Sequence, residues 1–362
     1  MNPDLVLLLG RKDDPTDAVE EYCHYLCEAL GQRSVKGEIA RVPWKECVSD
    51  GAFEELRRAS ANWRNRWVFL QYTALSWSER GFPWRALKFL RIVREAEAYP
   101  GVVFHDVEPY AGTRTVDVLR RQVQLRVMRR ILRVADLAVF TVPLNVVSWL
   151  GSASTKSVFI PVGANLPETR IVPESRGDPG VTRIAVYGIT GGAAGNEECV
   201  NITRAIRFAT ERGAKLELHV FGRGAAERET ELREKLHGLA VALRFDGLLP
   251  AAVVASAIQD AHATLFVRGA ISTRRGSAIA GIACGKPTIA YSGPDTAAPI
   301  TEAGVVLVNR NRPTELGEAL LHVATNQEFR DSLSQRSAHA QEMFFSWQAI
   351  AKRYVEAMNL KT

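Results

Sequence analysis

Residues 263–291 read ATLFVRGAISTRRGSAIAGIACGKPTIAY, and the order of elements in this stretch indicates the fold class. Its two hydrophobic runs, Ala263–Phe266 and Thr288–Tyr291, are typical of buried strands because each is short and mostly apolar. Ser277–Cys284 lies between them and is typical of a short helix. A strand, a crossover helix and a second strand predict two parallel neighbours in one sheet. The stretch therefore indicates an α/β protein.

The same alternation continues along the whole chain. In the first half, the expected strands are Leu5–Leu9, Trp67–Tyr72, Val102–His105, Leu137–Val142 and Ser157–Pro161, and the expected helices are Ala18–Leu30, Pro83–Ala98 and Thr115–Val134. In the second half, the other expected strands are Arg183–Gly188, Leu216–Phe221, Leu243–Asp246 and Val305–Leu307, and the other expected helices are Asn201–Glu211, Glu229–Leu239 and Ala251–Asp260. This order favours parallel sheets covered by helices.

The length of 362 residues predicts two domains, since one domain typically holds about 150 residues. The polar stretch Asn165–Val181 contains proline and glycine, interrupts the alternation and marks the junction. The predicted fold class is α/β, with two Rossmann-like, doubly wound domains at residues 1–164 and 165–343. Residues 344–362 are expected to form a helix that packs back on the N-terminal domain.

The composition excludes a disordered or fibrous protein, because 46% of the residues are hydrophobic and 24% are charged. Lys and Arg number 46 and Asp and Glu number 40, which gives a formal net charge of +6. A positive surplus of this size suits nucleic acid, an anionic membrane surface or a phosphorylated substrate. The net charge alone does not distinguish these three partners.

The five cysteines are scattered and odd in number, which predicts reduced thiols and a cytoplasmic location rather than a disulfide framework. Cys23 and Cys27 have the spacing of one helix face, and packing is favoured there over metal ligation because two further ligands cannot be placed. No run of about 18 apolar residues is present, so no transmembrane helix is predicted.

Three expected strands end in loops that contain glycine, at Gly10, at Gly188–Gly192 and at Gly222–Gly224. Ligands of open α/β sheets bind beyond the carboxyl ends of the strands, where backbone amides can face a phosphate. None of the three loops has the spacing of a dinucleotide fingerprint or a P-loop. Each glycine is therefore favoured as a turn residue.

The strongest local signal is the loop with Arg268, Arg274 and Arg275, which follows a strand and leads into a helix that starts at Gly276 and Ser277. Guanidinium groups, helix amides and the helix dipole then converge on one point, as binding of a diphosphate requires. The alternative is a solvated basic loop. Three arginines between a strand end and a helix start favour the anion site.

Short motifs recur in a fixed order over nearly the whole length. They are Ile160–Asn165 (IPVGAN), Leu218–Gly222 (LHVFG), Phe245–Pro250 (FDGLLP), Asp260–Phe266 (DAHATLF), Ala283–Ile289 (ACGKPTI) and Phe345–Trp347 (FSW). The first half adds Gln71-Tyr72 with Gly81 and Pro83, and Val103–Glu108 (VFHDVE). In this order and spacing the chain resembles a GT-B glycosyltransferase, closest to the retaining enzymes of the family-4 type.

The resemblance implies an N-terminal domain for the acceptor, a C-terminal domain for a nucleotide-sugar donor, and a cleft between them. The implied donor-binding residues are Gly188, Arg223, Arg268, Ser272, Arg274, Gly276 and Ser277. The implied catalytic residues are His105, Arg275 and Glu108, and the implied acceptor-binding residues are Thr16, Asp17 and Tyr72. A lone histidine is usually structural, but His105 at a strand end beside two carboxylates is placed for contact with a sugar hydroxyl.

The chain departs from the family pattern at two places. The family has two glutamates separated by seven residues, and Ser272 and Ala280 occupy their positions here, so recognition of the ribose and of the sugar must come from elsewhere. Basic residues that usually follow the first strand of the second domain are missing from Gly191–Glu198, and Arg223 is the substitute candidate. No D-x-D motif or cluster of metal ligands is evident, so no metal cofactor is expected.

The expected helix Thr115–Val134 is rich in arginine. Its arginines are Arg120, Arg121, Arg126, Arg129, Arg130 and Arg133, and Leu119, Val123, Val127, Ile131 and Val134 are expected to face the core. The basic face is either solvated or contacts an anionic membrane surface, as would suit an enzyme with a lipid-linked acceptor. Nucleic acid is the weakest of the three interpretations, because no nucleic-acid-binding motif accompanies the helix.

The favoured function is a metal-independent, retaining glycosyltransferase of the hexosyltransferase type. It would move a sugar from a nucleotide-diphosphate donor to a glycan or lipid-linked acceptor, in surface polysaccharide or glycoconjugate biosynthesis. The first alternative is a non-catalytic GT-B-like protein that binds a nucleotide sugar or a glycan. The second is a sugar-nucleotide epimerase of similar architecture. The expected location is cytoplasmic, with or without membrane association.

Overall fold

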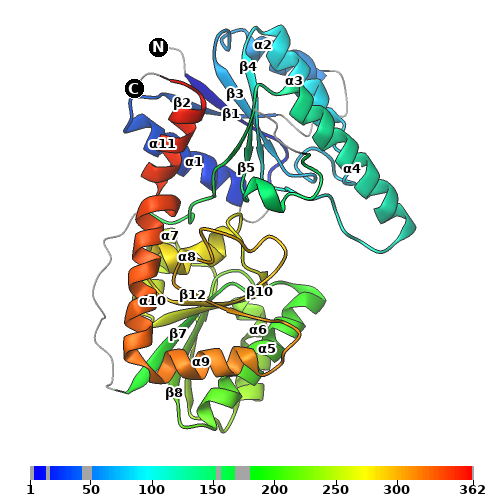
Figure 1. Ribbon diagram of the computed structural model, residues 1–362. Helices are drawn as coiled ribbons and strands as arrows, with labels where there is room; N and C mark the ends of the chain where they lie inside the picture. Colours follow the sequence, from blue (N-terminus) through cyan, green and yellow to red (C-terminus); the bar gives the residue numbers. More distant parts are fainter. Residues whose placement is uncertain (1–3, 14–16, 43–50, 152–155, 168–179, 361–362) are drawn as a thin grey trace. The chain divides into compact units, whose positions relative to one another are not determined.

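The computed structural model describes residues 4–13, 17–42, 51–151, 156–167 and 180–360 (Figure 1). The chain divides into two compact units. Unit 1 consists of Met1–Val162 with Trp347–Thr362, and unit 2 consists of Gly163–Ser346. Both units are α/β and built on a parallel sheet of six strands, which confirms the predicted fold class.

Unit 1 contains a sheet with the strand order β2-β1-β3-β4-β5-β6. Its elements are β1 (Leu5–Leu9), α1 (Ala18–Gly31), β2 (Gly37–Arg41), α2 (Gly51–Ser60), β3 (Trp67–Tyr72), α3 (Arg85–Glu95), β4 (Tyr99–Phe104), α4 (Thr115–Val134), β5 (Leu137–Phe140), η1 (Leu144–Val146), β6 (Ser157–Phe159) and α11 (Trp347–Ala357). Every strand pair is parallel.

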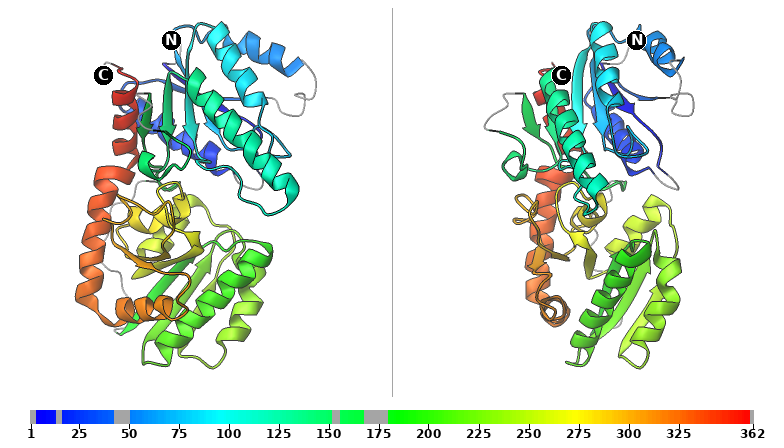
Figure 2. Two further views of the ribbon diagram at one scale, coloured as in Figure 1. Left: turned by 45° about the vertical axis from the view of Figure 1, so that its right-hand side comes forward. Right: turned by 90° about the vertical axis from the view of Figure 1, so that its right-hand side faces the viewer.

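Helices cover both faces of this sheet (Figure 2), so its central strands are apolar on both sides. Successive side chains of a strand point to opposite faces. Val6 and Leu8 of β1 belong to a core shared with α3 and α4. On the other face, the ring of Phe69 contacts Tyr354 of α11 with ring centroids 5.7 Å apart. The fully buried run of β1 follows from this arrangement.

Unit 2 contains a sheet with the strand order β12-β11-β10-β7-β8-β9, again parallel throughout. Its elements are β7 (Val181–Tyr187), α5 (Gly192–Thr210), β8 (Lys215–Phe221), α6 (Ala225–Leu236), β9 (Val241–Phe245), α7 (Ala251–Gln259), β10 (Ala263–Ala270), α8 (Gly276–Ala283), β11 (Thr288–Tyr291), β12 (Val305–Val308), α9 (Glu315–Thr325), α10 (Gln327–Ala340) and the π-helix η2 (Gln341–Phe345).

Helix α8 lies close to the sheet of unit 2, and this closeness depends on a residue without a side chain. A Cβ atom at Gly281 would lie 2.3 Å from the hydroxyl of Thr264 and 2.5 Å from that of Thr288. These two hydroxyls hydrogen-bond to each other at 2.9 Å on β10 and β11. This contact holds the last turn of α8 against the amino ends of β10 and β11, and the helix starts in the loop that follows the carboxyl end of β10.

The structure corrects the sequence prediction in a few places. It adds β2 and α2, which were not predicted. It extends β10 to Ala270, with a register shift between Phe266 and Ala270, so that Arg268 belongs to the strand and not to the loop after it. It also exposes Leu119, which was expected in the core. No helix in the described part of the chain is long and apolar enough to cross a membrane.

Candidate functional site

The expected donor residues of unit 2 meet at the carboxyl ends of β7, β8 and β10 and at the start of α8. Gly188 follows β7 with φ +79°, a backbone conformation that residues other than glycine rarely adopt. A Cβ atom there would lie only 3.0 Å from the Arg268 guanidinium, so this side chain lies against the backbone at the end of β7. The absence of a side chain at Gly188 therefore leaves room for the side chain of Arg268 to reach from β10 to the end of the neighbouring strand β7.

Arg275 is the residue immediately before α8 and lies at the centre of this group. Its guanidinium donates a hydrogen bond to the carbonyl of Arg268 at 3.2 Å. Arg274 forms an ion pair with Asp295, in which Nε lies 3.0 Å from the carboxylate. The structure thus brings the three arginines of the predicted anion site together in space.

The surroundings of Arg275 disfavour an uncompensated cation. Burial lowers the pKa of its guanidinium, and Arg274 and Arg268 lower it further, against the opposite effects of Asp295 and Glu198. Its Nε is buried without a hydrogen-bond partner among the described residues. A bound anion would supply the missing acceptor and the missing negative charge.

Ser272 and the start of α8 add further hydrogen-bonding groups to the same loop. Ser272 is fully buried, and its hydroxyl has no partner among the described residues. The first amides of a helix have no intrahelical acceptor and carry a partial positive charge, and those of α8 begin at Gly276 and Ser277. These two residues are only partly buried, so a ligand can reach them.

Arg223 lies on the loop after β8 and meets the other donor residues through its backbone. Its carbonyl accepts a hydrogen bond from the amide of Ile189 at 2.8 Å, which joins the loops after β7 and β8. The residue itself is exposed. The structure therefore places Arg223 at the same edge of the sheet as Gly188.

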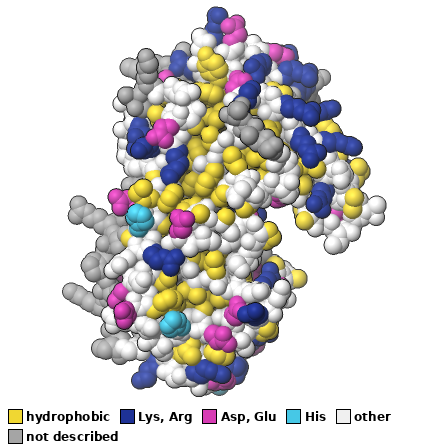
Figure 3. All heavy atoms as spheres, in the orientation of Figure 1, with side chains coloured by type: hydrophobic (Ala, Val, Ile, Leu, Met, Phe, Trp, Pro, Cys, Tyr) yellow, Lys and Arg dark blue, Asp and Glu magenta, His cyan; other side chains and the backbone are white. Residues whose placement is uncertain are grey.

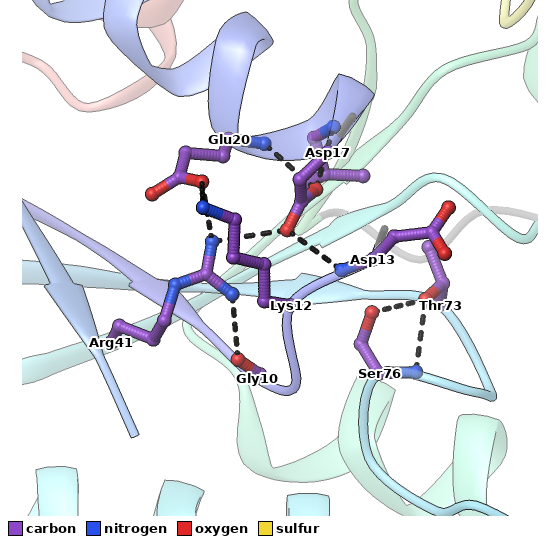
Figure 4. A network of polar contacts seen from close by, with 9 residues as sticks. Gly10, Lys12, Asp13, Asp17, Glu20, Arg41, Thr73 and Ser76 are labelled. Carbon is purple, nitrogen blue, oxygen red and sulfur yellow. Dashed lines mark hydrogen bonds and ion pairs between the residues drawn. The ribbon is translucent and has the colours of Figure 1, made fainter. Parts of the chain in front are cut away.

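In unit 1, Asp17 belongs to a network at the carboxyl ends of β1 and β2 (Figure 4). Its carboxylate caps α1 by accepting hydrogen bonds from the amides of Val19 and Glu20 at 3.2 and 3.1 Å. Arg41 lies 3.0 Å from Asp17 and 3.0 Å from Glu20. It also donates to the carbonyl of Gly10. Asp17 therefore has a structural role beside any contact with an acceptor.

The loops after β1 and β3 touch at Gly10. The amide of Arg11 donates to the carbonyl of Ser76 at 2.8 Å, and a Cβ atom at Gly10 would lie 2.3 Å from that same oxygen. The hydroxyls of Thr73 and Ser76 hydrogen-bond at 2.6 Å (Figure 4). Glycine is thus required at position 10 for this contact between the two backbones, because a side chain at that position would collide with the carbonyl of Ser76.

His105 directly follows β4 and is held by Gln71 of β3. Its Nε2 lies 2.9 Å from Oε1 of Gln71, whose amide nitrogen donates to the carbonyl of Phe69 at 3.3 Å. Since Oε1 can only accept, Nε2 carries the hydrogen and Nδ1 carries the lone pair. Burial lowers the pKa of His105 to about 4, although Asp17 opposes this effect. His105 is therefore neutral near pH 7.

The remaining predicted residues of unit 1 have other positions. Both carboxylate oxygens of Glu108 accept hydrogen bonds from Ser148, from its amide and its hydroxyl, each at 2.7 Å. Tyr72 is 0% exposed and packs against Phe104 in the core, and its hydroxyl has no partner among the described residues, so its contact with an acceptor stays a prediction. Thr16 lies outside the described residues.

Several residues around these sites were not identified from the sequence. Glu198 of α5 is buried and accepts a hydrogen bond from the amide of Thr190 at 2.8 Å, which holds the loop after β7. Asp295 pairs with Arg274, and Gln71 orients His105. The only sequence feature that could have indicated Glu198 is a carboxylate at a helix position expected to be buried, since glutamate is almost never buried without a partner. Within the described residues, no three His, Cys, Asp or Glu side chains are grouped as metal ligands.

Neither a protein-family model nor a curated protein sequence matches the chain. Its structure is similar to that of a glycosyltransferase from Rickettsia africae, with a TM-score of 0.65, 12% identity and complete coverage of both chains. It is also similar to HepE from Anabaena, solved with UDP and glucose, with a TM-score of 0.64 and 12% identity over 98% of this chain and 99% of HepE.

A third similar structure is a candidate UDP-N-acetylglucosamine 2-epimerase from Listeria monocytogenes. Its TM-score is 0.58 and its identity is 13%, over 99% of this chain and 96% of that one. At such low identities the likeness concerns the fold and not the reaction. The sheets, their order and these structural relatives together show that the chain has the GT-B fold.

Proposed function

We propose that this chain is a glycosyltransferase that uses a nucleotide-diphosphate sugar as donor and a glycan or lipid-linked acceptor. The observation that carries the proposal is the convergence of Arg268, Arg274 and Arg275 on the start of α8. Of the similar structures, HepE was solved with UDP and glucose and with UDP-glucose. The cytoplasm and surface polysaccharide biosynthesis are the proposed setting.

The charge at this site suits a diphosphate. Three guanidinium groups face two carboxylates, Asp295 and Glu198, so the loop keeps positive charge. Guanidinium groups bind phosphate oxygens through paired hydrogen bonds, and the amides at a helix start bind anions as well. The unpartnered Nε of Arg275 and hydroxyl of Ser272 supply two hydrogen-bonding groups that a ligand would satisfy.

The proposed chemistry needs no metal. When the bond between the sugar and the diphosphate breaks, negative charge grows on the departing phosphate. Arg275 and the amides of α8 stabilise that charge more in the transition state than in the ground state, which accelerates the reaction. We assign the retaining course and the hexosyl donor from the family resemblance. Ser272, in the position of the first missing glutamate, is the candidate contact to the donor sugar.

His105 is the proposed polar contact in unit 1. Because its imidazole is neutral and Nε2 is committed to Gln71, Nδ1 remains as an acceptor for a sugar hydroxyl. Glu108 and Asp17 retain only supporting roles, since both carboxylates are engaged by neighbouring groups.

The test is a thermal-shift screen with UDP-, GDP-, ADP- and dTDP-sugars, followed by product analysis with the nucleotide sugar that binds. Release of free nucleotide together with a new glycoside supports transfer. Stabilisation by a nucleotide sugar without turnover supports the non-catalytic alternative, which the missing glutamates favour. A changed sugar on an intact nucleotide supports the epimerase alternative, whose fold the Listeria structure shares. No shift with any nucleotide contradicts sugar transfer, epimerisation and nucleotide-sugar binding, and leaves only the glycan-binding form of the non-catalytic alternative.

A further inference from the structure

Helix α4 exposes large apolar side chains in its first turns. Val116, Val118 and Leu119 are 45%, 57% and 57% exposed. Further along the helix, Val123, Val127 and Ile131 are buried in the core of unit 1. The exposed group therefore lies on a part of α4 that the core does not cover.

Arginines share the outward face of α4 with these apolar residues. At 100° per residue, an arc of about 120° contains Val118, Leu119, Gln122, Arg126, Arg129, Arg130 and Arg133. All of these residues are exposed. Figure 3 shows Lys and Arg side chains gathered over α3 and α4, with hydrophobic ones toward the lower end of α4.

Helix α4 itself offers no unpaired carboxylate to this face. Its only carboxylate is Asp117, which is buried and paired with Arg120. Arg120 lies off the outward face, where it also donates to the carbonyl of Arg80 and lies over the ring of Tyr110. The four arginines of the outward face form no ion pair among the described residues.

An exposed tryptophan extends the surface onto α3. Trp84 is 42% exposed, and the guanidinium of Arg130 lies 5.9 Å from its ring centroid. Tryptophan and arginine side by side are typical of the interface between lipid headgroups and acyl chains, where one end of each side chain is apolar and the other polar.

We infer that the outward face of α4 is a docking surface for an anionic lipid bilayer. In this arrangement Val118 and Leu119 enter the boundary between headgroups and acyl chains, while Arg126, Arg129, Arg130 and Arg133 bind lipid phosphates. The inference does not depend on the proposed sugar transfer. Single exposed apolar residues are common on a solvated helix, but Val118 and Leu119 are adjacent and share one face of α4 with four arginines that form no ion pair among the described residues.

The apolar residues also favour a membrane over nucleic acid. The arginines would be sufficient to bind the phosphates of a nucleic acid. The phosphate backbone offers little apolar surface that Val118 and Leu119 could contact. Both kinds of side chain strengthen binding to an anionic bilayer. Each arginine raises the affinity by about five-fold, and the apolar side chains contribute by being buried. The same helix therefore makes two separable contributions to binding.

The test is cosedimentation of the full chain with phosphatidylcholine vesicles, with and without phosphatidylglycerol, at low and high salt. We expect binding only to the anionic vesicles, weakened by salt. The variant R126Q/R129Q should bind about 25-fold more weakly, and V118S/L119S about ten-fold or more. The control R212Q/K215Q removes the same charge from exposed positions of unit 2 and should bind like the wild type.

Absence of binding to anionic vesicles at low salt overturns the inference, as does wild-type binding by both α4 variants. A loss confined to R126Q/R129Q, together with tight binding of a DNA duplex, assigns the face to nucleic acid instead. Far-UV circular dichroism and the melting temperature establish that each variant is folded. Thermal shifts with nucleotide sugars should be unchanged in all variants, so failure here leaves the proposed function untouched.

Discussion

Replacing Arg275 with glutamine separates an anion-binding role from a structural one. The guanidinium donates one hydrogen bond, to the carbonyl of Arg268, and makes no ion pair among the described residues. Burial and the neighbouring Arg274 and Arg268 all penalise its charge. Glutamine loses a hydrogen bond worth about 1 kcal/mol but relieves this penalty. The melting temperature without ligand should therefore stay close to that of the wild type or rise.

Nucleotide binding should respond in the opposite direction. A hydrogen bond between a charged donor and a phosphate contributes about 1.5–3 kcal/mol, so Arg275→Gln should weaken binding of the nucleoside diphosphate that the thermal-shift screen selects roughly 10- to 150-fold. Titration calorimetry with that nucleotide measures this change directly. Arg275→Lys keeps the charge but loses the paired donors, and should recover only part of the affinity.

The matched control is Lys215→Gln, which removes one exposed positive charge. Lys215 is the first residue of β8 and lies at the opposite end of the strand from the candidate site. It should leave nucleotide binding unchanged. Nucleotide binding by folded Arg275→Gln as tight as that of the wild type would contradict a role of Arg275 in anion binding. A melting temperature far below that of the wild type would contradict it as well, because Arg275 would then be a structural residue.

Three further predictions concern unit 1. Asp17→Ala removes the cap of α1 and one ion-pair partner, and should lower the free energy of unfolding by about 2 kcal/mol in urea titrations; an unchanged midpoint would contradict the network. Gly10→Ala should cost about 1–3 kcal/mol because its Cβ meets the Ser76 carbonyl, whereas Gly151→Ala, with nothing within 4 Å, should be neutral. His105 takes up a proton more readily in the unfolded chain, so stability should fall from about pH 6.5 to its folded pKa of about 4. His105→Gln should flatten that fall, and an equally steep pH profile in this variant would contradict the assignment.

The strand and helix pattern of this chain could be predicted where each element buries a continuous run of side chains. The expected ranges Trp67–Tyr72 and Thr115–Val134 coincide with β3 and α4. Strand β2 was missed because its sequence, GEIAR, contains one glycine and two charged residues. It lies at the edge of the sheet and is defined by its pairing with β1, which is a contact between distant parts of the chain.

At the candidate site, the sequence identifies the arginines but not their partners. Arg274 and Arg275 lie beside a helix start, which is a local feature. Asp295 and Glu198 come from distant segments, and only the folded sheet brings them near these arginines. The contacts that set the charge of the loop are therefore not local in the sequence.

Strand geometry separates Tyr72 from its neighbour Gln71. The contact of Tyr72 with an acceptor is implied by the family resemblance alone, whereas the direction of each side chain follows the alternation along β3. Tyr72 shares its face with Val68 and Leu70 and therefore joins the same core. Gln71 points to the other face, where it meets His105. Of Gln71 and Tyr72, the alternation of side chains along β3 therefore favours Gln71 as the residue that faces His105.

Leu119 was misplaced for a related reason, and the error bears on the lipid-binding inference. The residues expected to face the core, beginning at Leu119, Val123 and Val127, were spaced four apart. Each step of four residues turns the helix by about 400°, so the direction drifts by about 40° per step. From Leu119 to Ile131 the drift reaches about 120°, which turns a buried row into an exposed one. A leucine that helical spacing alone assigns to the core thus lies among the arginines, and that position is what makes α4 suited to a bilayer.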